Sequence, residues 1–160
     1  MAEPTRAGLP SSVLLSPALP SSVLFACSMN SIRSPMAEGM LKHFHRKRIY
    51  VDSCGVRQGE VNPFAIAVMA EIGVDVSKHR AKTFDRLEDT SYDLVVTLSP
   101  EAHHQALELT RTMACDVEYW PTFDPTVMEG SRAAVLDAFR EVRDVLRTRI
   151  LARFPLVGAP

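Results

Sequence analysis

The stretch 23–38 constrains the fold of this chain more than any other part of the sequence. It begins with four apolar residues, Val23–Ala26, a run typical of a parallel strand that is covered on both faces. Cys27 follows at the carboxyl end of this strand. Ser34 precedes Pro35, and serine before proline is a common start of a helix, with serine as the N-cap. The pattern therefore predicts a strand, a tight loop and a helix capped by Ser34.

The two ends of the predicted loop carry groups suited to binding an anion. A thiol, Cys27, lies at its base, and a guanidinium, Arg33, lies six residues later. Backbone N–H groups between them can turn inward, and a thiol that faces such amides and an arginine is expected to be largely thiolate at neutral pH. Arginine can bind two phosphate oxygens at once and stabilise a transferring phosphoryl group. Ser34 can donate its hydroxyl to the sulfur, and Asn30 tolerates the left-handed backbone that such a loop needs.

The loop reads C-S-M-N-S-I-R-S and resembles that of the low-molecular-weight protein tyrosine phosphatase family, which includes related arsenate reductases. The family loop usually reads C-x-G-N-x-C-R-S, and the matching residues are Cys27, Asn30, Arg33 and Ser34. Met29 replaces a glycine, and Ile32 replaces a second cysteine that in many relatives protects the nucleophile through a disulfide. The resemblance covers almost everything after Ser22.

The resemblance implies roles for residues outside the matching positions. The rest of the phosphate loop would consist of Ser28, Met29, Ser31 and Ile32. Ser53, at the end of a second strand, would support this loop, and His79 would hydrogen-bond Asn30, although a surface histidine after a turn explains His79 nearly as well. Asp124, before Pro125, corresponds to the general acid of the family; in isolation, this dipeptide would be a turn former.

Strand-like and helix-like segments alternate along the chain, which predicts an α/β fold. The expected strands lie near 23–26, 49–53, 93–98 and 115–119, and the expected helices follow Ser34, begin at Pro63 and span 101–113 and 129–154. Right-handed crossovers then give three layers: a four-stranded parallel sheet in the order 2-1-3-4 with helices on both faces and the phosphate loop after strand 1. The ends of these strands would bring Cys27, Ser53, Ser99 and Asp124 to one edge of the sheet.

Length and composition indicate how many domains the chain contains and argue against a secreted lipoprotein. The 160 residues, with a net charge of −1 and 46% hydrophobic content, fit one soluble domain, which we place at 22–155. Residues 1–21 are rich in Pro, Ser and Ala, and we expect a disordered or loosely attached extension. L-F-A-C, ending at Cys27, superficially resembles a lipoprotein cleavage site, but prolines at positions 10, 17 and 20 break any apolar signal helix.

The three cysteines are an odd number and show neither a C-x-x-C motif nor zinc-like spacing with histidine, which suits a reducing cytosol. The absence of a basic excess argues against nucleic acid as a partner. We therefore expect a cytoplasmic monomer or weak dimer that has no metal or other cofactor and does not bind membranes. Its partner would be a phosphorylated protein or a small phosphomonoester.

The expected reaction is phosphomonoester hydrolysis through a cysteinyl-phosphate intermediate. Cys27 attacks phosphorus while the loop amides and Arg33 hold the oxygens, and Asp124 protonates the leaving group and then activates water. The family resemblance alone implies phosphotyrosine in proteins as the substrate. The non-enzymatic alternative to a phosphatase is a module that binds phosphoproteins without hydrolysing them.

Two other enzymatic alternatives remain open. Ser31 stands where phosphoarginine phosphatases carry threonine and arsenate reductases carry serine, so a protein-arginine phosphatase and an arsenate reductase with Cys27 as nucleophile are both candidates. Thioredoxin-coupled arsenate reductases show Leu-Cys where this chain has Leu98-Ser99, and no further thiol occurs before Cys115. Cys54 is the only other thiol expected near the loop, and a small buried structural cysteine is its simpler interpretation.

Overall fold

The computed structural model describes residues 18–88 and 91–156, so that most of the predicted extension 1–21 lies outside the described residues. The strands are β1 (Ser22–Cys27), β2 (Tyr50–Gly55), β3 (Leu94–Thr97) and β4 (Asp116–Tyr119). The α-helices are α2 (Arg33–His45), α3 (Pro63–Ala70), α4 (Pro100–Leu109) and α5 (Arg132–Arg153). Short 3-10 turns are η1 (Arg46–Arg48), η2 (Phe84–Arg86) and η3 (Pro125–Val127).

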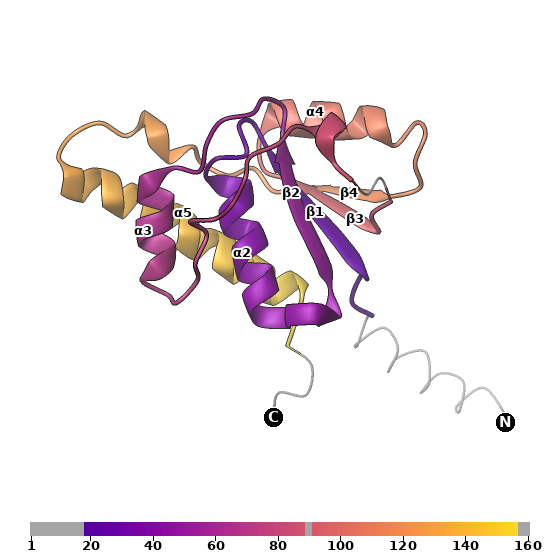
Figure 1. The fold of residues 1–160 in the computed structure, drawn as a ribbon, viewed down its shortest axis with the longest axis horizontal. Helices are drawn as coiled ribbons and strands as arrows, with labels where there is room; N and C mark the ends of the chain where they lie inside the picture. Colours follow the sequence, from indigo (N-terminus) through magenta and orange to yellow (C-terminus); the bar gives the residue numbers. More distant parts are fainter. Residues whose placement is uncertain (1–17, 89–90, 157–160) are drawn as a thin grey trace, which may run out of the picture.

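The four strands form one parallel sheet in the order β2-β1-β3-β4, which confirms the predicted topology (Figure 1). The two central strands are the most apolar, because both of their faces are covered. The edge strand β4 is only partly buried, and it carries Asp116 and Glu118. All four strands point the same way, so that the loops at their carboxyl ends share one edge of the sheet.

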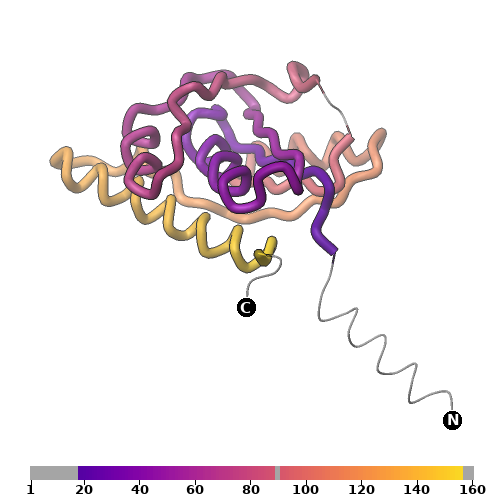
Figure 2. Tube along the Cα trace, turned by 60° about the horizontal axis from the view of Figure 1, so that its bottom comes forward, coloured from indigo at the N-terminus to yellow at the C-terminus, as the bar shows by residue number. Residues whose placement is uncertain are grey.

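Helices cover both faces of the sheet, as predicted. Helices α2 and α5 lie side by side on one face, and α3 packs against α5. Figure 2 shows α5 running alongside α2 over much of its length. Helix α4 packs against β1 and β3 on the opposite face (Figure 1). No helix among residues 18–88 and 91–156 is long and apolar enough to cross a membrane.

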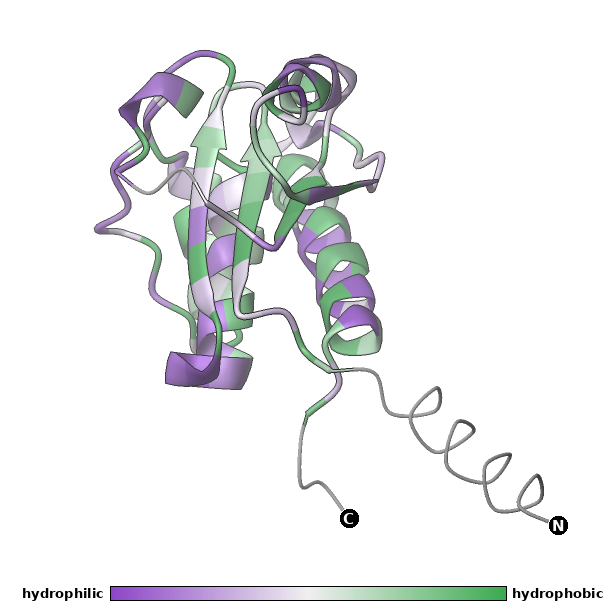
Figure 3. Cartoon of the chain, turned by 90° about the vertical axis from the view of Figure 1, so that its right-hand side faces the viewer, coloured by the Kyte–Doolittle hydropathy of each residue, from purple (hydrophilic) through white to green (hydrophobic). Residues whose placement is uncertain are grey.

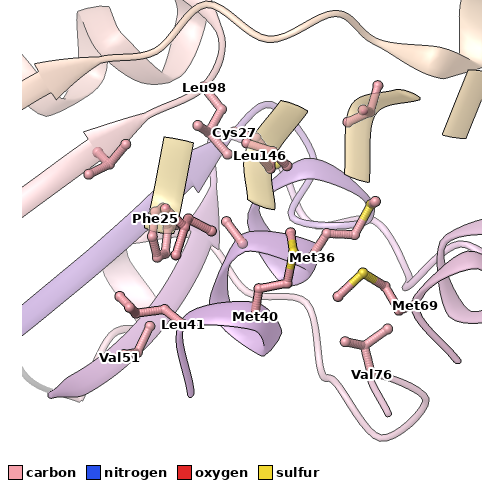
Figure 4. Packing of buried hydrophobic residues seen from close by; sticks show 14 of the residues in the cluster. Phe25, Cys27, Met36, Met40, Leu41, Val51, Met69, Val76, Leu98 and Leu146 are labelled. Carbon is pink, nitrogen blue, oxygen red and sulfur yellow. The ribbon is translucent and has the colours of Figure 1, made fainter. Parts of the chain in front are cut away.

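Alternate residues of β1 enter two hydrophobic clusters. Val23, Phe25 and Cys27 belong to the larger cluster under α2 and α5, whereas Leu24 and Ala26 belong to the smaller one under α4. Figure 4 shows part of the larger cluster, with Phe25 of β1 on one side of α2 and Met69 on the other. The helices carry both hydrophobic and hydrophilic residues along their length, as the colours of Figure 3 show. The alternation of side chains along the strands matters for the site, because it determines on which face of the sheet each cysteine lies.

Several predicted helix ends were wrong. Helix α2 begins at Arg33, and its N-cap is Ile32 without a side-chain hydrogen bond, so Ser34 is not the cap. The hydroxyl of Ser34 is instead engaged with the phosphate loop, as described below. Helix α5 starts later than predicted because Ser131 caps it by accepting a hydrogen bond from the Ala134 amide. Helix α4 ends at Leu109 rather than at residue 113.

Residues just before β1 are attached to the sheet. The Ser21 carbonyl accepts a hydrogen bond from the Tyr50 amide at 2.9 Å, and the Ser21 amide donates one to the Asp93 carboxylate at 2.7 Å. Leu19 packs against the larger hydrophobic cluster. The part of the chain that contacts the domain therefore begins before Ser22.

Candidate active site

Cys27 ends β1 and lies at the base of the loop that leads into α2. Its side chain is almost completely buried, and its Sγ atom lies 2.9 Å from the Oγ atom of Ser34, in the first turn of α2. A hydroxyl at this distance can donate a hydrogen bond to a thiolate and stabilise its charge. Ser34 therefore serves the sulfur rather than the end of the helix.

The loop backbone is held by hydrogen bonds from the segment after β2. Loop carbonyls of Cys27, Ser28, Met29 and Ser31 accept hydrogen bonds from the amides of Val56, Arg57, Gly59 and Asn62, respectively, at 2.8–3.1 Å. A side chain at Gly55 would place its Cβ 2.7 Å from the Asn30 amide nitrogen, so only glycine fits there. Because these carbonyls are occupied, the loop amides are the backbone groups that remain available to an anion.

Asn30 fixes the shape of the loop from inside. It has a φ of +54°, which is the left-handed backbone expected for this position, and its side chain is fully buried. Its Nδ2 atom donates to Ser34 Oγ at 2.8 Å and to Ser53 Oγ at 3.0 Å. Its Oδ1 atom accepts from the Lys82 amide at 3.0 Å and lies 3.0 Å from His79 Nε2. The family resemblance implied the contacts with Ser53 and His79.

Glu38 is a buried member of the same network that the sequence analysis overlooked. Ser53 Oγ donates to Glu38 Oε1 at 2.5 Å, and Lys42 Nζ pairs with Glu38 Oε2. His79 Nδ1 lies 3.6 Å from Glu38 Oε1. Burial lowers the pKa of His79, while the charge of Glu38 opposes that shift. The spacing offered a signal: Glu38 follows Ser34 by four residues, which places both side chains on one face of α2.

Arg33 contacts the loop that follows β4, and this loop carries Asp124. Arg33 Nη1 donates to the Thr122 carbonyl at 2.9 Å, which ties the guanidinium to this loop. The Asp124 carboxylate accepts hydrogen bonds from the amide and the hydroxyl of Thr126 at 3.0 and 2.7 Å. This Asx-type turn holds the carboxylate at a defined position.

A pocket of about 200 Å³ opens over the thiol and contains most of the predicted site residues. It is lined by Cys27, Ser28, Met29, Ser31, Ile32, Arg33, Arg57, Glu101, Asp124 and Thr126. Asn30, Ser34, Ser53 and His79 do not line it and lie behind the loop. Arg57 and Glu101 were not among the predicted site residues, because the loop after β2 and the first turn of α4 become neighbours only in the fold.

The structure accounts for both departures from the family loop. The side chain of Met29 is 39% exposed and lies against Gly59, so its bulk does not enter the core. Ile32 is buried in the larger hydrophobic cluster, where an apolar side chain is favourable. Ser28 points to α4, where its Oγ atom lies 3.1 Å from the Oγ atom of Ser99.

The other two cysteines lie away from this pocket. Cys54 pairs in register with Ala26 and packs with it in the smaller cluster, on the face of the sheet opposite to Cys27. Burial, reinforced by the negative charges of Cys27 and Asp52, raises the pKa of the Cys54 thiol far above its ordinary range. Cys115 packs against the same smaller cluster. Among the described residues, no group of three or more His, Cys, Asp or Glu side chains could hold a metal ion.

The family model for "Low molecular weight phosphotyrosine protein phosphatase" matches residues 22–152. The chain belongs to this family. The members of this family that are similar to the chain include proteins named as arsenate reductases and proteins named as tyrosine phosphatases. The glutaredoxin arsenate reductase of Synechocystis sp. is 32% identical over 134 residues, which cover 80% of this chain and 92% of that protein.

Solved structures of the low-molecular-weight phosphatase family give the same mixture of names. A structure described as an arsenate reductase in the phosphate-binding state is 31% identical, with a TM-score of 0.64, and the match covers 82% of this chain and 95% of that one. The low molecular weight protein tyrosine phosphatase from T. tengcongensis is 26% identical, with a TM-score of 0.68, and the match covers 81% and 94% of the two chains. The fold and the family are thus shared by proteins named for two different reactions.

Proposed function

We propose that this protein hydrolyses phosphomonoesters through a covalent cysteinyl-phosphate intermediate, as a phosphatase of the low-molecular-weight protein tyrosine phosphatase type. The observation that carries the proposal is that Asp124 lines the same pocket as Cys27 and Arg33, while neither of the chain's other two thiols lies on that face of the sheet. A carboxylate beside the nucleophile serves hydrolysis, whereas reduction of arsenate within the chain needs a second thiol.

In the first step the Cys27 thiolate attacks phosphorus, and an S–P bond forms as the ester P–O bond breaks. The loop amides and Arg33 bind the non-bridging oxygens, on which charge builds up in the transition state. Asp124, in its acid form, gives its proton to the departing oxygen. Ser34 stabilises the sulfur through the hydrogen bond described above.

In the second step water attacks phosphorus and transfers a proton to the Asp124 carboxylate. The S–P bond breaks, the thiolate returns and inorganic phosphate leaves. Atoms and charges balance over the two steps without a metal or an organic cofactor, because both the nucleophile and the proton carrier belong to the chain.

Arsenate reduction is the second candidate, because the similar proteins named above include arsenate reductases. Here Cys27 would attack arsenate and lose water to form an S–As bond. An external thiol, such as glutathione, would then attack the Cys27 sulfur, release arsenite as the two-electron product and leave a mixed disulfide. A second external thiol would restore Cys27. The position of Cys54 on the opposite face of the sheet disfavours an internal disulfide in place of the external thiol.

Purified protein tested on three substrate classes separates these reactions. We expect phosphate release from aryl phosphates and phosphotyrosine peptides, and loss of that release in Cys27→Ser. Phosphoarginine peptides test the protein-arginine phosphatase alternative. Arsenate is supplied with either thioredoxin or glutathione and glutaredoxin, and arsenite is measured.

The pattern of products decides between the candidates. Arsenite formation at a rate comparable to or above phosphate release would replace the phosphatase proposal by arsenate reduction. Binding of phosphopeptides without any product would indicate a phosphoprotein-binding module. A matched control is Cys54→Ser, which changes a thiol outside the pocket and should leave phosphate release unaffected.

A further inference from the structure

A groove with basic walls follows one face of α2, outside the pocket over Cys27. Two adjoining hollows form it, of about 450 and 500 Å³, and Lys42 lines both. Pro35 and Gly39 line the first hollow together with Lys42, and their spacing of three to four residues places them on one face of the helix. The loop between α3 and η2 and the first residues of β2 supply the other walls.

Positive charge is in excess along this groove. The basic residues that line it are Lys42, Arg46, Lys47, Lys78, Arg80 and Lys82. The acidic side chains already have partners. Glu38 pairs with Lys42, Asp52 pairs with Lys82 at 2.7 Å, and Asp75 accepts two hydrogen bonds from Ser77. The other four basic residues form no ion pair with another described residue, so they are available to an anionic ligand.

The cations are spread along the groove and are not gathered at one point. The helical rise from Pro35 to Lys42 is about 10 Å, and Arg46 and Lys47 lie beyond it. A single phosphate ion reaches only one part of such a row. A chain of phosphate groups carries charge along its whole length, and arginine and lysine both bind phosphate oxygens. The distribution of charge therefore favours a linear oligophosphate over an isolated anion.

The groove also touches the network that supports the phosphate loop. Glu38 and His79 line its first hollow, and both belong to the group of side chains around Asn30. Lys42, whose side chain is 53% exposed, pairs with Glu38. An anion that binds Lys42 competes with Glu38 for this cation, and it also repels an anion in the phosphate loop. Both effects predict that occupancy of one site weakens binding at the other.

We propose that the groove along α2 is a second anion site, which binds a linear chain of phosphate groups and thereby weakens the binding of phosphate-like anions at the loop of Cys27. The chain is either a free polyphosphate or the polyphosphate tail of a nucleotide. Arg80 and Lys47, from the two hollows, bind the chain, and Lys42 transmits its presence to Glu38. Neither the site nor its test depends on phosphatase activity, so the inference goes beyond the proposed function.

Calorimetry with tripolyphosphate tests the site. The measurements use Arg33→Ala protein without divalent cations, because this variant lacks the guanidinium that binds anions in the phosphate loop. In that background Arg80→Ala and Lys47→Ala should each weaken binding about two- to fivefold, as expected for one exposed charge contact. Arg111→Ala removes the same charge beyond the end of α4, outside the groove, and should change nothing.

Other anions identify the ligand. Orthophosphate should bind about tenfold more weakly than tripolyphosphate, because linked phosphates reach several cations at once. ATP that binds more tightly than tripolyphosphate would indicate a nucleotide, and equal or weaker binding of ATP would indicate free polyphosphate; both results uphold the site. A hexaglutamate peptide that binds as tightly as tripolyphosphate would overturn the phosphate chain in favour of an acidic protein segment.

The coupling is measured in the wild type through orthovanadate, which has the geometry of phosphate. Saturating tripolyphosphate should weaken vanadate binding about fivefold and then no further, a limit that competition for one shared site does not show. Displacement of vanadate without a limit would refute the coupling. Tripolyphosphate binding that is lost in Arg33→Ala, or that is unchanged in both Arg80→Ala and Lys47→Ala, would place the anion in the phosphate loop alone and refute the second site.

Discussion

The Nε2 atom of His79 lies 3.0 Å from the Oδ1 atom of Asn30, and this contact joins the loop after α3 to the phosphate loop. Because Oδ1 can only accept, the ring nitrogen that faces it carries the proton. Asn30 has its other hydrogen bonds within the same buried group, and it holds a φ of +54°. The shape of the phosphate loop therefore depends on one side chain and on the segment that surrounds it.

Replacement of Asn30 should cost stability through two separate causes. Asn30→Ala removes the hydrogen bonds of a fully buried side chain and places alanine in left-handed backbone, and we expect a loss of about 2–4 kcal/mol in the free energy of unfolding. Asn30→Gly loses the same hydrogen bonds, but glycine adopts the left-handed backbone without strain. This variant should therefore be about 1 kcal/mol more stable than Asn30→Ala. Urea denaturation measures both; equal stability of the two variants would show that the backbone is not strained.

The pKa of His79 makes the stability of the protein depend on pH. Burial lowers this pKa below its ordinary value of about 6.5, against the charge of Glu38, so the unfolded state binds a proton more readily than the folded state. Stability from this group is complete above about pH 6.5 and falls as the pH drops below that value.

The variant His79→Gln keeps a donor for Asn30 but does not titrate. The wild type should therefore lose more of its unfolding free energy between pH 7.5 and pH 5.5 than His79→Gln does. Chemical denaturation at the two pH values gives the comparison. Parallel pH dependence in the two proteins would mean that His79 is not the group responsible.

Arsenate turnover with thioredoxin as the sole reductant should not be sustained. The thiol of Cys54 is buried on the face of the sheet opposite to Cys27, and Ser99 and Ile32 supply no thiol at the two places where the family resemblance leads one to expect a cysteine. The measurement is NADPH oxidation coupled through thioredoxin reductase. Sustained turnover that disappears in Cys54→Ala would show that β2 moves enough to bring the two sulfurs together.

The leaving group should determine how much Asp124 contributes. An activated aryl phosphate departs without a proton, whereas phenyl and alkyl phosphates need one. We expect Asp124→Asn to lose about 10²- to 10⁴-fold in kcat on phenyl phosphate and distinctly less on nitrophenyl phosphate. Steady-state kinetics with both substrates checks this, with Asp137→Asn on the exposed face of α5 as a control. An equal loss on both substrates would reduce Asp124 to a turn residue held by Thr126.

Much of the fold could be predicted because local pattern and global topology agree. The apolar run before Cys27 is a central strand, and the alternation of strands and helices leaves few topologies that satisfy right-handed crossovers. The start of α2 could not be predicted, because serine before proline is a good cap in isolation. Only the folded loop brings Cys27 and Asn30 close enough to engage the Ser34 hydroxyl instead.

The site was predictable where its residues are close together in the sequence. Cys27 and Arg33 lie on one loop, so their spacing carries the information. Asp124 lies almost a hundred residues further on, and the family resemblance was needed to connect it with the loop. The pairing of Arg57 with Glu101 joins the loop after β2 to the first turn of α4, which meet only in the tertiary structure, and neither residue stands out from other exposed charges.

Trapping the covalent intermediate tests the central claim most directly. The protein is mixed with phenyl phosphate, denatured in acid within milliseconds, digested and analysed by mass spectrometry. The account predicts one added phosphoryl group on the peptide that contains Cys27, with a larger amount trapped in Asp124→Asn on nitrophenyl phosphate, where release by water is slowed. Phosphate release without any phosphorylated Cys27 in either protein, or a phosphoryl group on another residue, would contradict it.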